Sequence, residues 1–126
     1  MQIYDHDSPE AINFKNSSIE LEDWIELLNY SEKEISNLLS LVKSTPKENE
    51  ELTLRIKNLE HIREVNMNNL AKLMKYRSSL PKAAECEDVE CDMFYVNEHI
   101  SYRKMYRDHI ENYRKIKEEF FEAMIE

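Results

Sequence analysis

The sequence predicts an all-α fold in which three long antiparallel helices form an up-down-up, coiled-coil-like bundle. The 126 residues include no glycine, and strand hairpins depend on glycine where the backbone needs positive φ. Apolar residues recur at heptad spacing along three segments that are separated by prolines. With 41% apolar and 34% charged residues, the chain is too apolar to stay disordered, so a single packed bundle is expected over residues 17–126.

The first helix is expected over about residues 18–43, preceded by a partly ordered N-terminal arm at residues 1–16. Ser17 followed by Glu20 matches a capping box, and Ser8-Pro9-Glu10 offers a separate start for one helical turn. The seam predicted to face the core consists of Leu21, Trp24, Leu28, Ser31, Ile35, Leu38 and Val42.

The second helix is expected over about residues 46–78. Thr45-Pro46-Lys47-Glu48 supplies a threonine cap, a proline at the first helical position and an early glutamate. The short connection from the first helix predicts an antiparallel hairpin. The predicted seam consists of Leu52, Leu59, Ile62, Asn66, Asn69 or Leu70, Leu73 and Tyr76.

The third helix is expected over about residues 88–125, after a connector in which Pro81 disfavours helix at Leu80. Its predicted seam consists of Tyr95, His99, Tyr102, Tyr106, His109, Tyr113, Ile116, Phe120 and Ala123.

Four polar residues in these seams predict polar layers inside the core. Counting back from the two expected turns places Ser31 level with His109, and Asn66 level with His99. Buried polar groups need hydrogen-bond partners, and polar residues in a helical seam fix register at a cost in stability. We therefore interpret these four residues as two register-setting layers.

A metal-binding bundle is the alternative function, with His61, His99 and His109 as weak candidate ligands. An acid precedes each of these histidines, but adjacent side chains diverge by about 100° on a helix. The Glu-x-x-His spacing of di-iron bundles is missing. We therefore expect no bound metal and no cofactor. A small-molecule pocket lined by Tyr102, Tyr106 and Tyr113 is a third possibility.

No catalytic motif is present, so the sequence indicates a protein that is not an enzyme. The absence of glycine excludes the P-loop and the dinucleotide-binding fingerprint. Cys86 and Cys91 lie in an acidic connector, which should raise thiol pKa and reduce reactivity. Two reduced thiols are favoured, with a disulfide or a redox role as the alternatives.

The net charge of −9 and the lack of a strongly basic segment argue against binding to nucleic acid or to an anionic membrane. The N-terminus lacks a signal-peptide pattern, and no run approaches the roughly 20 apolar residues of a membrane span. These features predict a cytoplasmic, acidic protein.

The unequal helix lengths leave an apolar overhang at the C-terminus, formed by Phe120, Phe121, Met124 and Ile125. These residues either cover the turn near Thr45 or contact a second subunit, where aromatic residues and Met are common. The sequence thus favours a helical interaction or scaffold protein that self-associates, as a homodimer, or binds a helical partner.

The segments NLEHIREVNMNNLAKL and HISYRKMYRDHIENYRKIKEEFFEAM resemble parts of small uncharacterised helical-bundle proteins of Bacteroidetes-type bacteria. In that group a Glu-His pair recurs on the middle helix, here Glu60-His61, and a histidine recurs on the last helix, here His109. The resemblance implies an antiparallel helical bundle and no known activity. Ferritin-like and hemerythrin-like bundles share the architecture, but this sequence departs from both at the ligand spacing.

Overall fold

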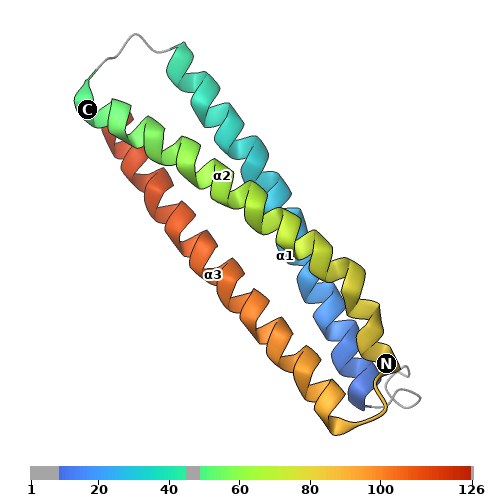
Figure 1. Ribbon diagram of the computed structural model, residues 1–126. Helices are drawn as coiled ribbons and strands as arrows, with labels where there is room; N and C mark the ends of the chain where they lie inside the picture. The colour runs from blue at the N-terminus through green and yellow to red at the C-terminus, as the bar shows by residue number, and fades with distance from the viewer. Residues whose placement is uncertain (1–8, 45–48, 126) are drawn as a thin grey trace.

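The computed structural model describes residues 9–44 and 49–125, with side chains from Phe14 onward, and arranges them as three long helices (Figure 1). These are α1 (Pro9–Lys43), α2 (Glu50–Ser79) and α3 (Val89–Ile125), with a 3₁₀ helix, η2 (Leu80–Glu85), between α2 and α3. The described residues contain no strand. The predicted all-α bundle is confirmed.

Helix α1 begins at Pro9, well before the predicted start near residue 18. Proline suits the first position of a helix because its φ is already helical and no N–H is needed there. Ser17 and Glu20 therefore lie inside the helix, and the capping-box prediction is wrong. Residues 9–16, predicted to belong to a partly ordered arm, instead extend α1 by about two turns.

Helix α2 begins at Glu50, four residues after the predicted proline start. Asn49 is its N-cap: the Asn49 Oδ1 accepts a 2.6 Å hydrogen bond from the backbone N–H of Leu52. The cap predicted at residues 45–48 lies outside the described residues. The helix ends at Ser79, but Leu80 keeps helical angles (φ −58°, ψ −37°) and begins η2. The prediction that Pro81 disfavours helix at Leu80 is therefore wrong. Pro81 lies in the first turn of η2, where its missing N–H costs nothing.

The core consists of two apolar clusters with polar residues between them. Every α2 position that is buried was in the predicted seam. One cluster contains Leu21, Trp24, Ile25, Leu28, Leu73, Tyr76, Leu80 and Ile110. The other contains Ile35, Leu38, Leu52, Leu59, Ile62, Tyr113, Phe120 and Ala123.

The C-terminal overhang is divided between core and surface. Phe120 is fully buried, so its assignment to a possible interface is wrong, and Met124 packs partly against the core. Phe121 and Ile125 remain 44% and 85% exposed. Figure 1 shows the end of α3 beside the start of α2, where the overhang covers the second apolar cluster.

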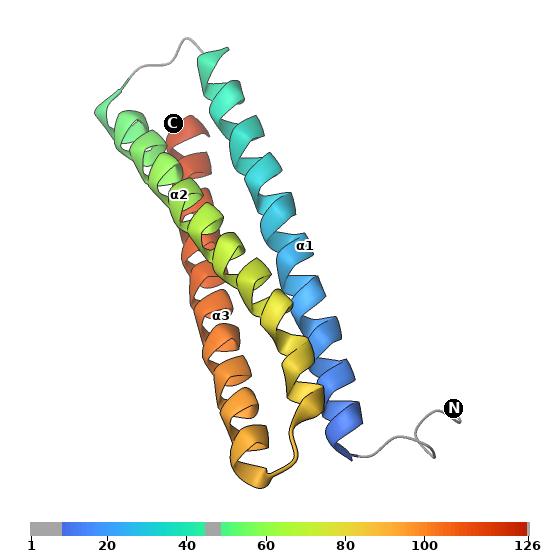
Figure 2. The same cartoon turned by 45° about the vertical axis from the view of Figure 1, so that its right-hand side comes forward.

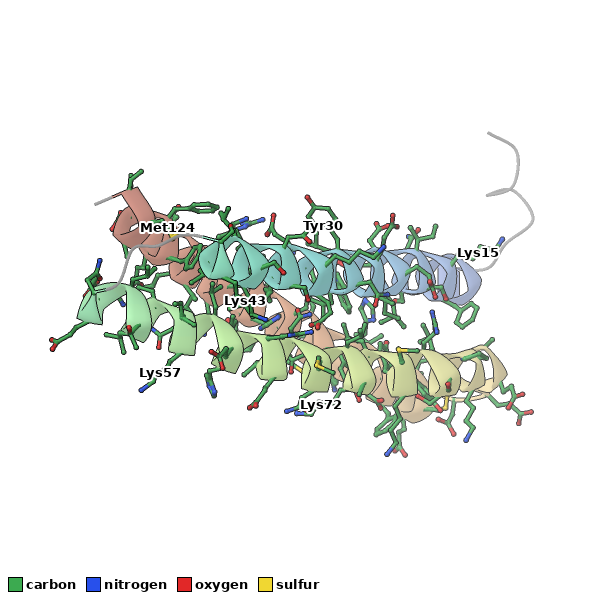
Figure 3. All side chains as sticks on the ribbon, turned by 90° about the horizontal axis from the view of Figure 1, so that it is seen from above. Lys15, Tyr30, Lys43, Lys57, Lys72 and Met124 are labelled. Atoms are coloured by element: carbon green, nitrogen blue, oxygen red, sulfur yellow. A yellow bond between two sulfur atoms is a disulfide. The ribbon has the colours of Figure 1, made fainter. Side chains whose placement is uncertain are left out.

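Helices α1 and α3 run in the same direction and flank α2 (Figure 2). Two sets of contacts define their relative level: Glu20 with His99 and Arg103 near one end, and Glu34 with Tyr113 and Lys117 farther along. Figure 3 shows Tyr30 projecting from α1 on the side away from α2. The α1/α3 side of the bundle thus presents two parallel helices to the surroundings.

Candidate functional site

His99 is the centre of a polar layer that reaches the surface. Its Nε2 lies 2.6 Å from Glu20 Oε1, and its Nδ1 lies 2.6 Å from the Tyr76 hydroxyl. An ionised carboxylate can only accept, so Nε2 carries the proton and donates to Glu20. Nδ1 then accepts from Tyr76. Both ring nitrogens of His99 thus have a hydrogen-bond partner although the residue is only 4% exposed.

Arg103 completes this outer layer by binding the same carboxylate. Its Nη2 lies 2.7 Å from Glu20 Oε1, and its Nε lies 3.1 Å from Glu20 Oε2. The Arg103 hydrogen bond is the main reason that the pKa of Glu20 is lowered, and the same bond raises the pKa of Arg103. The layer therefore carries a fixed ion pair at its outer edge.

Aromatic rings hold His99 in position. The Trp24 ring stacks on His99 with centroids 5.0 Å apart, and Tyr102 stacks on Tyr76 at 4.3 Å. Burial raises the pKa of Tyr76 far above its usual range, so its hydroxyl remains a donor.

His109 is the centre of a second layer that is enclosed on all sides. The Asn66 Nδ2 donates to the backbone carbonyl of Leu28 at 2.9 Å, which turns the amide oxygen toward His109. His109 Nε2 donates to that oxygen at 2.8 Å. The His109 Nδ1 is buried with no hydrogen-bond partner. Burial lowers the pKa of His109, so this layer is neutral.

The burial of all four predicted polar residues is confirmed, with Ser31, Asn66, His99 and His109 each at most 5% exposed. Their predicted pairings are wrong. Asn66 pairs with His109 instead of His99, and Ser31 donates to the Leu27 carbonyl within α1 at 2.9 Å. The turns are longer than was assumed, which shifts the helices along one another. The outer layer also includes Tyr76, which was predicted as a seam residue only, and Glu20, which was assigned to a capping box. Arg103, its third member, was not predicted from the sequence.

A groove between α1 and α3 opens directly over the outer layer. Its volume is about 550 Å³, and Glu20, His99 and Arg103 line it. Three of its other lining residues are exposed hydrophobics: Ile19 at 63%, Val96 at 44% and Ile100 at 50%. The remaining lining residues are Asn16, Ser17 and Asp23.

A second hollow of about 470 Å³ lies farther along α3 and is lined by Tyr106, Arg107, Ile110, Glu111 and Arg114. Tyr106 stacks on Trp24 of α1 at 5.4 Å, which places this hollow on the same side of the bundle as the groove. We call the surface that carries both hollows the α1/α3 face. It combines exposed apolar side chains with charges of both signs.

No protein-family model, curated protein or solved structure matches this chain. The resemblance drawn from the Glu60-His61 and His109 segments therefore stays a prediction.

The candidate metal ligands do not converge. His61 is exposed on α2, while His99 and His109 are ten residues apart on α3, about 15 Å along the helix. Within residues 9–44 and 49–125, no group of three or more His, Cys, Asp or Glu residues is placed to hold a metal ion.

The three tyrosines proposed to line a pocket each have a separate environment. Tyr102 stacks on Tyr76, Tyr106 stacks on Trp24, and the Tyr113 hydroxyl donates to the Glu34 carboxylate. Burial opposes ionisation of Glu34, but the Tyr113 hydrogen bond and Lys117 outweigh it and lower its pKa. The rings therefore do not enclose one cavity.

Cys86 and Cys91 form a disulfide, so the favoured expectation of two reduced thiols is wrong. The end of η2 brings their Cα atoms to 5.5 Å, which is within the range that a disulfide spans. Asp88, between them, caps α3: its Oδ1 accepts from the backbone N–H of Cys91 at 2.7 Å. The disulfide thus links the first turn of α3 covalently to the connector that follows η2.

Proposed function

We propose that this protein is a non-enzymatic interaction or scaffold protein whose α1/α3 face binds a helix, either from another copy or from a helical partner. The observation that carries the proposal is the set of three exposed side chains, Ile19, Val96 and Ile100, gathered around one groove. Exposed apolar groups that cluster in a concavity rimmed by charge are typical of protein-binding surfaces.

The groove suits a helix because two parallel helices already form its walls. A partner helix packed on this face contacts the exposed side chains of α1 and α3, as in recognition of an amphipathic helix by a groove, and extends the three-helix arrangement. The Glu20–Arg103 ion pair supplies a polar floor that favours a partner with matching polar groups.

The test is capture of partners from native lysate by the tagged chain under reversible crosslinking. The groove variant carries Ile19→Asp and Ile100→Asp. The control carries Leu54→Asp and Met67→Asp, which alter comparably exposed hydrophobics of α2 (48% and 54%). We expect wild type and control to retain the same proteins, and the groove variant to lose them. Equal retention by all three would contradict the proposal.

No helix within the described residues is long and apolar enough to cross a membrane. We propose the cytoplasm as the site of action. The Cys86–Cys91 disulfide opposes this location, since disulfides are rare in a reducing compartment. Alkylation of free thiols at the moment of lysis, followed by mass measurement, decides the matter: two alkylated cysteines support the cytoplasm, and an unmodified pair contradicts it.

A further inference from the structure

We propose that the partner on the α1/α3 face is a second copy of this chain, related by a two-fold axis parallel to the helices. In this dimer α1 of each protomer lies over α3 of the other, and four helices form the contact. This inference rests on the proposed function and names its partner. Five features of the face support it: the levels of its residues, its apolar ends, its charges, the position of Tyr30 and its size.

The levels of α1 and α3 make the face self-complementary about such an axis. The contacts of Glu20 with His99 and Arg103, and of Glu34 with Lys117, show that the two helices run parallel and in step. A two-fold axis along the helices keeps each residue at its own level, so a residue of α1 meets the α3 residues that lie level with it. In a symmetric dimer every such contact occurs twice.

Apolar side chains meet at this register. Ile19 shares its groove with Val96 and Ile100, and so it lies level with them. Across the axis, Ile19 packs on the partner's Val96 and Ile100, and the reciprocal contact forms as well. Phe121 lies on the same edge of α3 as Val96, because 25 residues is close to seven helical turns. It adds a 44% exposed aromatic ring at the other end of the face.

Charges select this symmetry over the alternative. The α1 edge of the face carries Asp23 and, about one helical turn later, Glu26. The α3 edge carries three arginines, Arg103, Arg107 and Arg114, and one acid, Glu111. With α1 over α3, the two acids of α1 face the partner's arginines. A two-fold axis perpendicular to the helices would instead place α1 on α1 and α3 on α3, which opposes like charges and is unfavourable.

Tyr30 fits the same arrangement. It is 61% exposed and precedes Glu34 by one turn, so it lies level with the stretch of α3 between Arg107 and Arg114. Across the axis its ring faces the partner's guanidinium groups, an arrangement that favours a cation–π contact.

The size of the face is sufficient for a stable dimer. From Ile19 to Leu41 the helices run about 33 Å, and two helices side by side are about 20 Å wide. The footprint is therefore roughly 700 Å² per protomer, near the roughly 800 Å² of a standard interface.

Charge reversal tests both the dimer and its symmetry. Glu26 and Arg107 are exposed and lie level with one another on the two edges of the face. Sedimentation velocity between about 1 and 100 µM compares the purified wild-type chain with four variants. These are Glu26→Arg, Arg107→Glu, the double variant with both substitutions, and the α2 control Lys72→Glu. Circular dichroism establishes that each variant is folded.

We expect wild type and control to dimerise with the same Kd, each single reversal to weaken association by about tenfold, and the double reversal to restore it. A wild-type chain that stays monomeric at about 100 µM would overturn the dimer and leave the helical-partner function to the capture experiment. A dimer whose Kd is unchanged by both single reversals would overturn the α1-over-α3 arrangement.

Discussion

The two histidines of α3 lie in layers of opposite character. His109 donates to Asn66, whose amide ends on the backbone carbonyl of Leu28, so every group in that layer is neutral and buried. His99 donates to a carboxylate that is 32% exposed and bound by Arg103. The inner layer fixes how α1, α2 and α3 align, while the outer layer brings charge to the floor of a groove. Histidine has a structural role in the first and a surface-linked role in the second.

The largest expected effect comes from Asn66→Leu, which tests the inner layer. The substitution removes two buried hydrogen bonds and leaves both ring nitrogens of His109 without a partner. We expect the free energy of unfolding to fall by about 2–4 kcal/mol in urea denaturation. The double variant Asn66→Leu/His109→Leu should recover much of this loss, because an apolar pair leaves no stranded donor. Losses that simply add would show that the two residues are not coupled.

Asn66 also shows which features could be predicted from the sequence, because its burial was predicted correctly and its partner was not. Its burial followed from heptad spacing, as did that of the whole α2 seam, because periodicity alone determines which face of a helix turns inward. Its partner did not follow, because a turn that is a few residues longer slides one helix past another by more than a helical turn. Seams were therefore predictable, and pairings were not.

Glu20 was missed for a related reason. Its spacing from Ser17 matched a capping box, and the local pattern obscured a tertiary role that is visible only when α3 is placed beside α1. The disulfide was missed because the prediction relied on compartment and composition. Only the path of η2 brings Cys86 within reach of Cys91.

Tyr76→Phe tests whether the buried hydrogen bond between Tyr76 and His99 contributes to the stability of the fold. The substitution keeps the ring but removes the hydroxyl that donates to His99 Nδ1. Since Tyr76 and His99 are 1% and 4% exposed, the acceptor is left unsatisfied, and we expect a loss of about 1–2 kcal/mol in urea denaturation. Tyr102→Phe, whose ring stacks on Tyr76, is the control and should cost less than about 0.5 kcal/mol. Equal costs would argue that the hydroxyl bond to His99 contributes nothing specific.

The pH dependence of stability separates the neutral layer from the charged one. Unfolded His109 titrates near pH 6.5, whereas burial lowers its pKa in the folded chain. Between these pKa values the unfolded state binds more protons, so stability falls as the pH drops below about 6.5, by at most about 1.4 kcal/mol per pH unit. Glu20 and Glu34, whose folded pKa values lie below 4.5, lose their contribution only below that pH.

Urea denaturation between pH 7.5 and pH 3 measures the two pH ranges in which stability is expected to decline, one below about pH 6.5 and one below about pH 4.5. In His109→Gln the decline that begins near pH 6.5 should flatten, while the decline at acid pH remains. The control is His61→Gln, which alters an exposed histidine of α2 and keeps His109, so the decline that begins near pH 6.5 should remain. If the pH profile of His109→Gln matches that of the wild type, the decline below about pH 6.5 arises from a group other than His109.

The smallest expected effect comes from Glu20→Gln, which neutralises the outer layer. Glu20 is partly exposed, so solvent screens its attraction to Arg103, and a glutamine oxygen still accepts from His99 or Arg103. We expect the free energy of unfolding to fall by about 1 kcal/mol or less, and by less at high salt.

Measuring Glu20→Gln and Asn66→Leu in the same denaturation series tests whether the inner layer, and not the outer one, stabilises the alignment of the helices. A loss as large as that of Asn66→Leu would show that the ion pair fixes the alignment of α1 and α3, and that the groove floor is structural. A small loss, together with altered partner binding in the capture experiment, would identify Glu20 as a residue of the docking surface that contributes little to folding.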